Sequence, residues 1–194
     1  MRLQNNQIGT NMKKIAFILT AAFLLITTQG CNTKPETTTG KAAIEQRLKS
    51  IYSEVDGIAN AGRGNTSGLY KKYCSKAFNE LRSEVIYWEN KADEMIIEQD
   101  CWIRAQDWEK LEYEITEIEI TGEATATAVV TQTDIVPACN DGVRRYSNNT
   151  LVKLVRENGN WFIDDFTDYD IEGELGEHSD CGLFKAALKE YKGE

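Results

Sequence analysis

The segment Leu151–Asp165, with the sequence LVKLVRENGNWFIDD, decides the fold because it contains the clearest turn signal in the chain. Its central pair, Asn158-Gly159, tolerates the positive φ angles that a two-residue hairpin turn requires. Strands are expected on both sides of this pair, best defined at Thr150–Val155 and at Trp161–Asp168. The sequence therefore predicts an antiparallel hairpin near the end of the chain.

Two further strands are predicted upstream of this hairpin. Isoleucine alternates with glutamate in Leu111–Ile120, and alanine and valine alternate with threonine in Ala124–Ile135. A period of two places such residues on opposite faces of a strand. The small alanine side chains leave room for something bulky against their face. A closely packed helix is the first expectation there, and a ligand cavity is the alternative.

Helical periodicity appears before and after these strands. In Lys41–Ala61, apolar residues recur every three or four positions, which predicts an amphipathic helix. Ser67–Asp93 is predicted to be helical, in one piece or two, and Gly182–Tyr191 is predicted to form a short final helix. Met95–Lys110 mixes aromatic and charged residues without a clear period, and we expect an irregular connection there.

This order of elements predicts a single α+β domain over residues 41–194, with the helices on one face of an antiparallel sheet. It resembles the nuclear-transport-factor-2-like group, also called the cystatin-like α+β cone. The residues that carry the resemblance are the N-terminal helices and Leu151–Asp165. The resemblance implies N-terminal helices packed on a curved four-stranded antiparallel sheet, followed by a short C-terminal helix.

The resemblance also implies where a cavity would lie. Known members of the group include isomerases and dehydratases that hold an acid, or an Asp–His pair, inside the cone. The cavity is expected between the helices and the concave face of the sheet, near Tyr73, Trp88, Trp102 and Trp161. Asp107 or Asp165 would be the general base there. Asp164 precedes Asp165 on a strand, so the two are expected to point to opposite faces and not to pair.

Residues Met12–Cys31, with the sequence MKKIAFILTAAFLLITTQGC, have the pattern of a secretory signal. The apolar run Ile15–Ile26 is shorter than the roughly 20 residues that span a bilayer as a helix. The region around Cys31 resembles the lipobox of bacterial lipoproteins, in which a cysteine after a small residue is lipidated. An ordinary secretory signal cut nearby is the alternative. Met1–Asn11 has no signal character, and we expect Met12 to be the true start.

On this interpretation, residues 1–30 are a signal segment and residues 31–40 are a lipidated tether that joins the domain to a membrane. Asn32 is not the aspartate that retains some lipoproteins at the inner membrane, so the outer membrane is preferred. Removing residues 1–30 takes away three basic residues and no acidic one, and the net charge of −9 becomes −12. A chain this acidic lacks the basic patch that binding to nucleic acid requires.

Four cysteines follow Cys31, and an even number in an exported chain predicts disulfides. In an antiparallel meander, the loop between the second and third strands lies at the same end as the exit of the fourth strand. This topology favours a Cys139–Cys181 bridge, which leaves Cys74–Cys101. The two other connectivities remain open.

Metal and cofactor sites have little support in the sequence. The chain has a single histidine, His178, so no structural zinc site is expected. Asp168–Ser179 partly resembles a calcium loop, but Ser179 stands where a bidentate glutamate is required. No glycine-rich phosphate loop and no nucleophile elbow is present. We therefore expect neither a metal nor a cofactor.

Three functions follow from these observations. The first is a lipid-anchored cell-envelope protein that acts as a non-catalytic binding or assembly module, with a small ligand or an envelope protein as its partner. The second is a small-molecule enzyme of the isomerase or dehydratase type that uses a carboxylate in the cavity. The third is a scaffold whose interior is filled by its own side chains.

Overall fold

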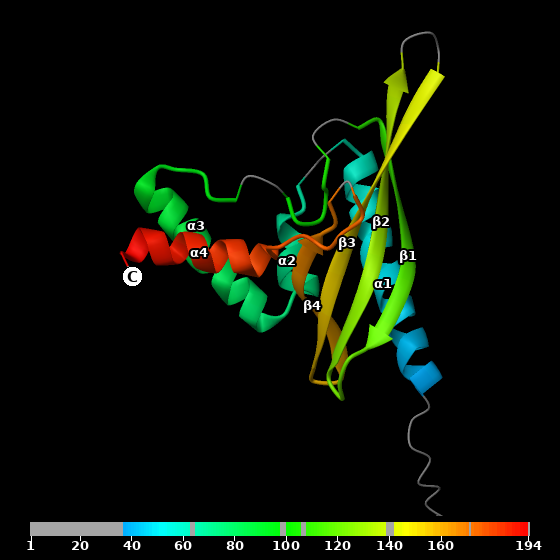
Figure 1. The fold of residues 1–194 in the computed structure, drawn as a ribbon, viewed down its shortest axis with the longest axis horizontal. Helices are drawn as coiled ribbons and strands as arrows, with labels where there is room; N and C mark the ends of the chain where they lie inside the picture. Colours follow the sequence, from blue (N-terminus) through cyan, green and yellow to red (C-terminus); the bar gives the residue numbers. More distant parts are fainter. Residues whose placement is uncertain are drawn as a thin grey trace, which may run out of the picture. The chain divides into compact units, whose positions relative to one another are not determined.

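A computed structural model of the chain describes residues 37–62, 65–97, 100–105, 108–138, 142–170 and 172–193. The helices and strands formed by these residues are shown in Figure 1. In chain order they are α1 (Thr37–Asn60), α2 (Ser67–Tyr73), α3 (Lys76–Ala92), β1 (Lys110–Ile120), β2 (Thr125–Ala138), β3 (Gly142–Glu157), β4 (Asn160–Asp168) and α4 (Asp180–Lys192). The predicted signal segment and Cys31 lie outside the described residues. Since α1 begins at Thr37, residues 37–40 are helical and do not belong to an irregular tether.

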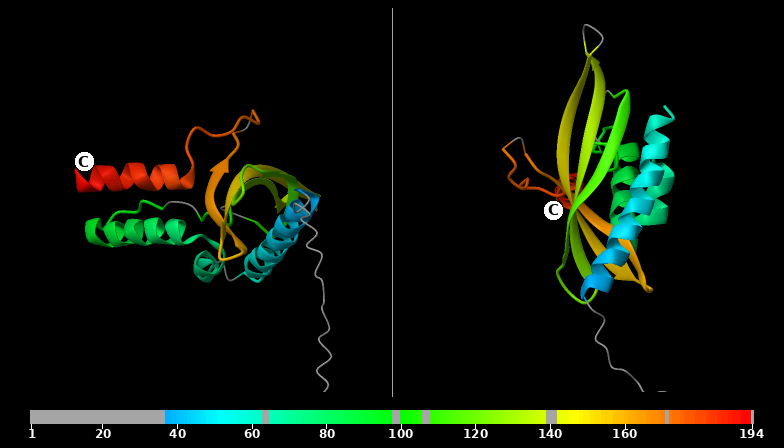
Figure 2. Two further views of the ribbon diagram at one scale, coloured as in Figure 1. Left: turned by 90° about the horizontal axis from the view of Figure 1, so that it is seen from below. Right: turned by 90° about the vertical axis from the view of Figure 1, so that its right-hand side faces the viewer.

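The four strands form one open antiparallel sheet in the order β1-β2-β3-β4. Each strand pairs with the next one along the chain, so the sheet is a meander. The α+β class and the four antiparallel strands are therefore confirmed. Seen from below in Figure 2, the sheet is curved.

The β3–β4 turn has the geometry that its sequence predicts. Asn158 has a φ of 50° and Gly159 a φ of 83°, and Glu157 pairs with Asn160 across the turn. Positive φ at both central residues is characteristic of the type I′ turn, whose twist matches that of the flanking strands. The Asn-Gly pair thus fixes the register of the hairpin.

Helix α1 lies along β1 in Figures 1 and 2 and buries its predicted apolar stripe. Ile44, Leu48, Ile51 and Val55 are fully buried. Each such side chain contributes about 1.5–3 kcal/mol through the removal of its apolar surface from water. The amphipathic pattern therefore determines which face of α1 contacts the sheet.

The predicted second helical segment is divided into α2 and α3 at Cys74-Ser75. The Ser75 hydroxyl accepts a hydrogen bond from the Phe78 backbone N–H (3.0 Å) and so caps the N-terminus of α3. A serine cap satisfies one of the N–H groups that a helix leaves unpaired in its first turn. The cap gives a local reason for a new helix to start here.

Helices α3 and α4 pack against each other beside β4, on the side of the sheet away from β1 (Figure 2). The rings of Phe78 and Phe184 are 6.1 Å apart between centroids. Lys192 and Glu84 form an ion pair of 2.7 Å farther along the two helices. The sheet thus has different neighbours at its two edges.

The predicted irregular connection between α3 and β1 is confirmed for its described residues, and Trp102 anchors it. The indole is 1% exposed and packs against Tyr52, Tyr70, Tyr73 and Phe166. Aromatic side chains therefore fill the space between the helices and the sheet.

Candidate functional site

The aromatic residues predicted to line one cavity are dispersed in the structure. Tyr73 and Trp102 are buried against each other in the core, 6.5 Å apart between ring centroids. Trp88 lies on α3, where its ring contacts Lys91 and Tyr87. Trp161 lies at the start of β4 and is half-buried. The structure therefore does not bring these four residues together around a common space.

Asp165 lines a small cavity of about 240 Å³, and Asp164 lines the same cavity. The sequence argument that the two carboxylates point to opposite faces is wrong because β4 has a bulge at Asp164. Lys153 pairs with Asp165, and Leu154 pairs with Ile163, so Asp164 has no partner across the ladder. An extra residue in one strand disturbs the strict alternation of side chains.

Both carboxylates already have partners within the protein. Asp165 Oδ1 accepts hydrogen bonds from the backbone N–H groups of Phe166 (2.9 Å) and Cys181 (3.0 Å), and Lys153 approaches Oδ2 at 3.4 Å. Asp164 Oδ1 accepts a hydrogen bond from the Ser75 hydroxyl at 2.5 Å. These contacts join α3, β4 and α4, which is a structural role. The other predicted base, Asp107, lies outside the described residues.

Cys74, Cys101 and Cys181 are free thiols in the structure, which therefore contains neither predicted bridge. Cys139 lies outside the described residues, and the connectivity of the disulfides stays a prediction. Burial raises the pKa of the Cys101 thiol and raises the pKa of Cys181 to about 12. Thiols with such pKa values carry little thiolate at neutral pH and are poor nucleophiles.

A larger cavity, of about 510 Å³, lies beside Arg104, whose side chain is 8% exposed. Its guanidinium contacts Asp180 at 2.6 Å and Asp168 at 3.1 Å. Burial raises the pKa of Asp180, and the adjacent Arg104 partly offsets this rise. The Arg104–Asp180 pair ties the start of α4 to the connection that precedes β1. His178 lines the same cavity, and its side chain is exposed.

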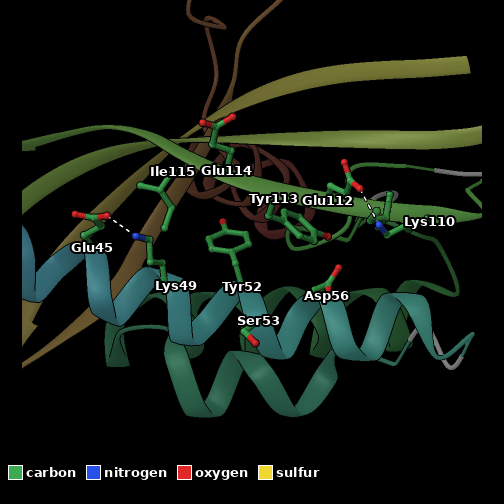
Figure 3. Close-up of a pocket in the computed structure, with 11 residues that line it drawn as sticks. Glu45, Lys49, Tyr52, Ser53, Asp56, Lys110, Glu112, Tyr113, Glu114 and Ile115 are labelled. Carbon is green, nitrogen blue, oxygen red and sulfur yellow. Dashed lines mark hydrogen bonds and ion pairs between the residues drawn. The ribbon is translucent and has the colours of Figure 1, made fainter.

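The largest of these spaces, of about 560 Å³, is the α1–β1 groove shown in Figure 3. It lies between α1 and the first half of β1. Its α1 wall is formed by Glu45, Lys49, Tyr52, Ser53 and Asp56, and its β1 wall by residues 110–115. The rings of Tyr52 and Tyr113 meet 5.1 Å apart in the groove. Burial raises the pKa of both phenols, so both are neutral at physiological pH.

The β1 wall of the groove is an open edge of the sheet, because among the described strands β1 pairs only with β2. At Leu111 the edge is covered by a side chain: Asn60 Nδ2 donates to the Leu111 carbonyl (3.1 Å), and the Leu111 N–H donates to Asn60 Oδ1 (2.9 Å). The Asn60 amide thus takes the place of a neighbouring strand. These two bonds show that the N–H and C=O of Leu111 point away from β2.

In an antiparallel strand, every second residue directs its backbone groups to the same edge. Tyr113 and Ile115 therefore share the outward orientation of Leu111. Among the described residues, none from α1 or from a loop bonds to the backbone of Tyr113 or Ile115. Each residue therefore presents a backbone donor and an acceptor to the groove.

A row of four glutamates occupies the other face of β1, at positions 112, 114, 117 and 119, and we call it the glutamate row. Glu112 is contacted by Lys110 and Arg145, and its hydrogen bond with Lys110 is the main reason that its pKa is lowered. Glu114, Glu117 and Glu119 are exposed. Within the described part of the chain, none of these three forms an ion pair.

The sequence interpretation missed this groove, although one signal for it was present. The four glutamates of LEYEITEIEI, at positions 112, 114, 117 and 119, are the kind of charge placement that protects an exposed edge strand from aggregation. What the pattern could not reveal is that α1 would lie alongside this edge. The groove needs both walls, and they come from segments about 60 residues apart.

The described residues contain no group of three or more His, Cys, Asp or Glu side chains arranged to hold a metal ion. None of the described helices is long and apolar enough to cross a membrane. Searches with the whole chain found no matching family model and no matching curated protein. The groove, which offers backbone hydrogen-bonding groups beside apolar and charged side chains, is therefore the candidate site.

Proposed function

We propose that this chain is a lipid-anchored cell-envelope protein whose domain binds an extended polypeptide segment in the α1–β1 groove. The segment adds to β1 as a further strand, and no chemical step follows. The observation that carries this proposal is the pair of outward-facing backbones at Tyr113 and Ile115 in the wall of a 560 Å³ groove. Strand addition to an open edge is a common way of recognising extended peptides.

The strength of such binding can be estimated from its hydrogen bonds. Tyr113 and Ile115 each offer one N–H and one C=O group, and a backbone hydrogen bond contributes about 1 kcal/mol net. The total of about 4 kcal/mol corresponds to a millimolar dissociation constant. Tighter binding requires side-chain contacts, and the rings of Tyr52 and Tyr113 provide apolar surface for them.

The proposal includes the nuclear-transport-factor-2-like cone and the location of the protein in the cell envelope. The helices that precede the meander and the curvature of the sheet support the cone (Figure 2). The sequence Met12–Cys31 supports export and lipidation at Cys31, with the outer membrane as the preferred site. In the Cys31→Ala variant, the protein should move from the membrane fraction to the soluble fraction. Continued membrane association would rule out this anchor.

An isomerase or dehydratase activity has weaker support. Asp165 accepts two backbone hydrogen bonds and contacts Lys153, so its oxygens are already engaged. A general base needs a free lone pair within reach of the substrate proton. We therefore place the function in the groove and not in the cavity beside β4.

The test uses the full chain and a capped seven-residue peptide in which glutamine alternates with valine. Titration of the peptide should shift the backbone amide NMR signals of residues 110–115 and protect the Tyr113 and Ile115 amides from hydrogen exchange. The controls are two N-methylated forms of the same peptide. In each form, alternate amides are methylated, so that the methyl groups lie on one edge of the extended peptide in the first form and on the opposite edge in the second. If each of the two methylated forms binds as well as the parent peptide, strand addition is excluded.

A variant of the protein provides a second control. Ile115→Pro removes one outward N–H, and proline is tolerated on a strand edge whose N–H does not join the ladder. Ile115→Val retains this N–H group and a similar apolar side chain. We expect binding to weaken at least fivefold in the proline variant and to stay within twofold in the valine variant. Equal affinities for these two variants would contradict the proposal.

A further inference from the structure

We infer that the segment bound in the α1–β1 groove is basic on one face and apolar on the other, with lysine or arginine at every second position. This inference rests on the proposed function, because it specifies the class of partner for the same site. It follows from the chemistry of the two faces of β1. A strand added to β1 continues both of these faces.

One face of β1 carries the glutamate row, and the neighbouring strand leaves this row without basic partners. The β2 residues that pair with it are Thr133, Thr131, Val129 and Thr127, none of which is charged. Lys110 and Arg145 contact Glu112 at the beginning of the row only. Basic partners for the other glutamates can therefore come from a strand added on the open side of β1.

Basic side chains at alternate positions of that strand would lie opposite Glu112 and Glu114, and a bulge of β1 between Ile115 and Glu117 shifts the register before Glu117 and Glu119. Opposite charges at paired positions of neighbouring strands contribute about 0.2–1 kcal/mol for each pair, and like charges oppose pairing. A segment with lysine or arginine at alternate positions therefore gains at both pairs at once. An acidic segment loses at the same positions.

The other face of β1 is apolar where it faces the groove. Leu111 is fully buried there, and Tyr113 and Ile115 are half-buried and pack against the core. The alternate side chains of an added strand would lie beside these residues and α1. Valine, isoleucine or leucine suits these positions, since small and branched apolar side chains pack well on a pleated surface.

The same charges argue against a second copy of this chain as the occupant. If β1 of one copy paired with β1 of another, the two glutamate rows would continue the same face, with like charges next to each other. Repulsion of this kind is a recognised means by which edge strands avoid self-pairing. A partner of opposite charge meets no such barrier.

The experiment compares three capped seven-residue peptides in which valine alternates with lysine, glutamine or glutamate. Binding to the full chain is measured by fluorescence anisotropy at low ionic strength. The lysine peptide should bind roughly fivefold more tightly than the glutamine peptide, from about two charge pairs of 0.5 kcal/mol each. The glutamate peptide should bind more weakly than both. The preference for lysine should decrease as salt is added.

The outcomes separate this inference from the proposed function. If the lysine and glutamine peptides bind with equal affinity, the inference about charge is overturned and strand addition stands. If none of the three peptides binds, the proposed function itself fails. If both forms of the lysine peptide that are N-methylated on alternate amides bind as tightly as their parent, charge alone attracts the peptide, which contradicts both the inference and the proposed function.

Matched variants of the protein locate the effect. Replacing Glu114, Glu117 and Glu119 by glutamine should lower the preference for the lysine peptide. The control replaces Glu172, Glu174 and Glu177, three exposed acids in the loop before α4, and changes the net charge by the same amount. The preference should survive in the control. Equal loss in both variants would show that only the net charge of the protein matters.

Discussion

The two edges of the sheet have different neighbours, and the proposed binding surface lies at the edge with fewer contacts. At the β4 edge, backbone carbonyl groups accept hydrogen bonds from other parts of the chain. Arg47 Nε donates to Trp161 (3.1 Å), the Ser75 N–H to Ile163 (2.7 Å), and the Gly176 N–H to Asp168 (2.8 Å).

Among the residues that the structure describes, the β1 edge has one such contact, the Asn60 side chain at Leu111. The helices α3 and α4 pack beside β4, whereas α1 packs along β1 and leaves a groove beside the first half of that strand (Figure 3). An open edge is a liability for aggregation. The glutamate row protects this edge from self-pairing, and the same edge is where we propose that a peptide binds.

The largest expected effect concerns Trp102, which is buried between the helices and the sheet. Trp102→Ala should lower the free energy of unfolding by about 3–5 kcal/mol, because the buried indole is replaced by a cavity among Tyr52, Tyr70, Tyr73 and Phe166. Urea denaturation measures the loss. Tyr87→Ala on exposed α3 surface is the control and should change stability by no more than about 0.5 kcal/mol. Equal losses would contradict the packing described for Trp102.

The next largest effect concerns the ion pair that holds α4 near the covered edge. Arg104→Met should cost about 3 kcal/mol at pH 7, because Asp180 is left buried and charged without its partner. Burial already raises the pKa of Asp180, and loss of Arg104 raises it further. The folded state then binds a proton at a higher pH than the unfolded state does. The loss of stability is therefore complete above the raised pKa and shrinks as the pH falls toward the ordinary range for aspartate.

Denaturation of the Arg104→Met variant at pH 7 and at pH 4.5 measures this dependence. The double variant Arg104→Met/Asp180→Asn removes the buried charge and should lose most of the extra pH dependence. If the single and double variants respond identically to pH, Asp180 is not the group responsible.

The smallest effect tests the open edge itself. Asn60→Ala removes the two hydrogen bonds to Leu111 and should cost about 1 kcal/mol of stability. It also exposes one more pair of backbone groups in the groove, so the valine–lysine peptide should bind a few-fold more tightly. Asn90→Ala is the control: the Asn90 amide donates to the Ile86 carbonyl of its own helix, and its loss should leave binding unchanged. Unchanged binding in Asn60→Ala would show that the bound strand does not reach Leu111.

Much of the fold could be predicted because the deciding signals are local. The Asn158-Gly159 turn, the apolar stripe of α1 and the period of two in β1 and β2 each depend on residues close together in sequence. The candidate cavity could not be predicted in the same way. Tyr73 and Trp102 are residue types that often line pockets. Whether their aromatic rings line a space or fill it depends on how they pack with distant residues. The bulge at Asp164 likewise depends on how β3 and β4 pair across the sheet.

The sequence by itself determined the α+β class, the order of the elements and the acidic face of β1, because periodicity, turn chemistry and charge are properties of short segments. Only the tertiary structure decided that β4 would be covered, that β1 would stay open and that α1 would lie beside it. Those outcomes depend on contacts such as Ser75 with Ile163 and Asn60 with Leu111, which join residues 51 to 88 positions apart. Contacts at such separations arise from the packing of the whole domain, and no short segment specifies them.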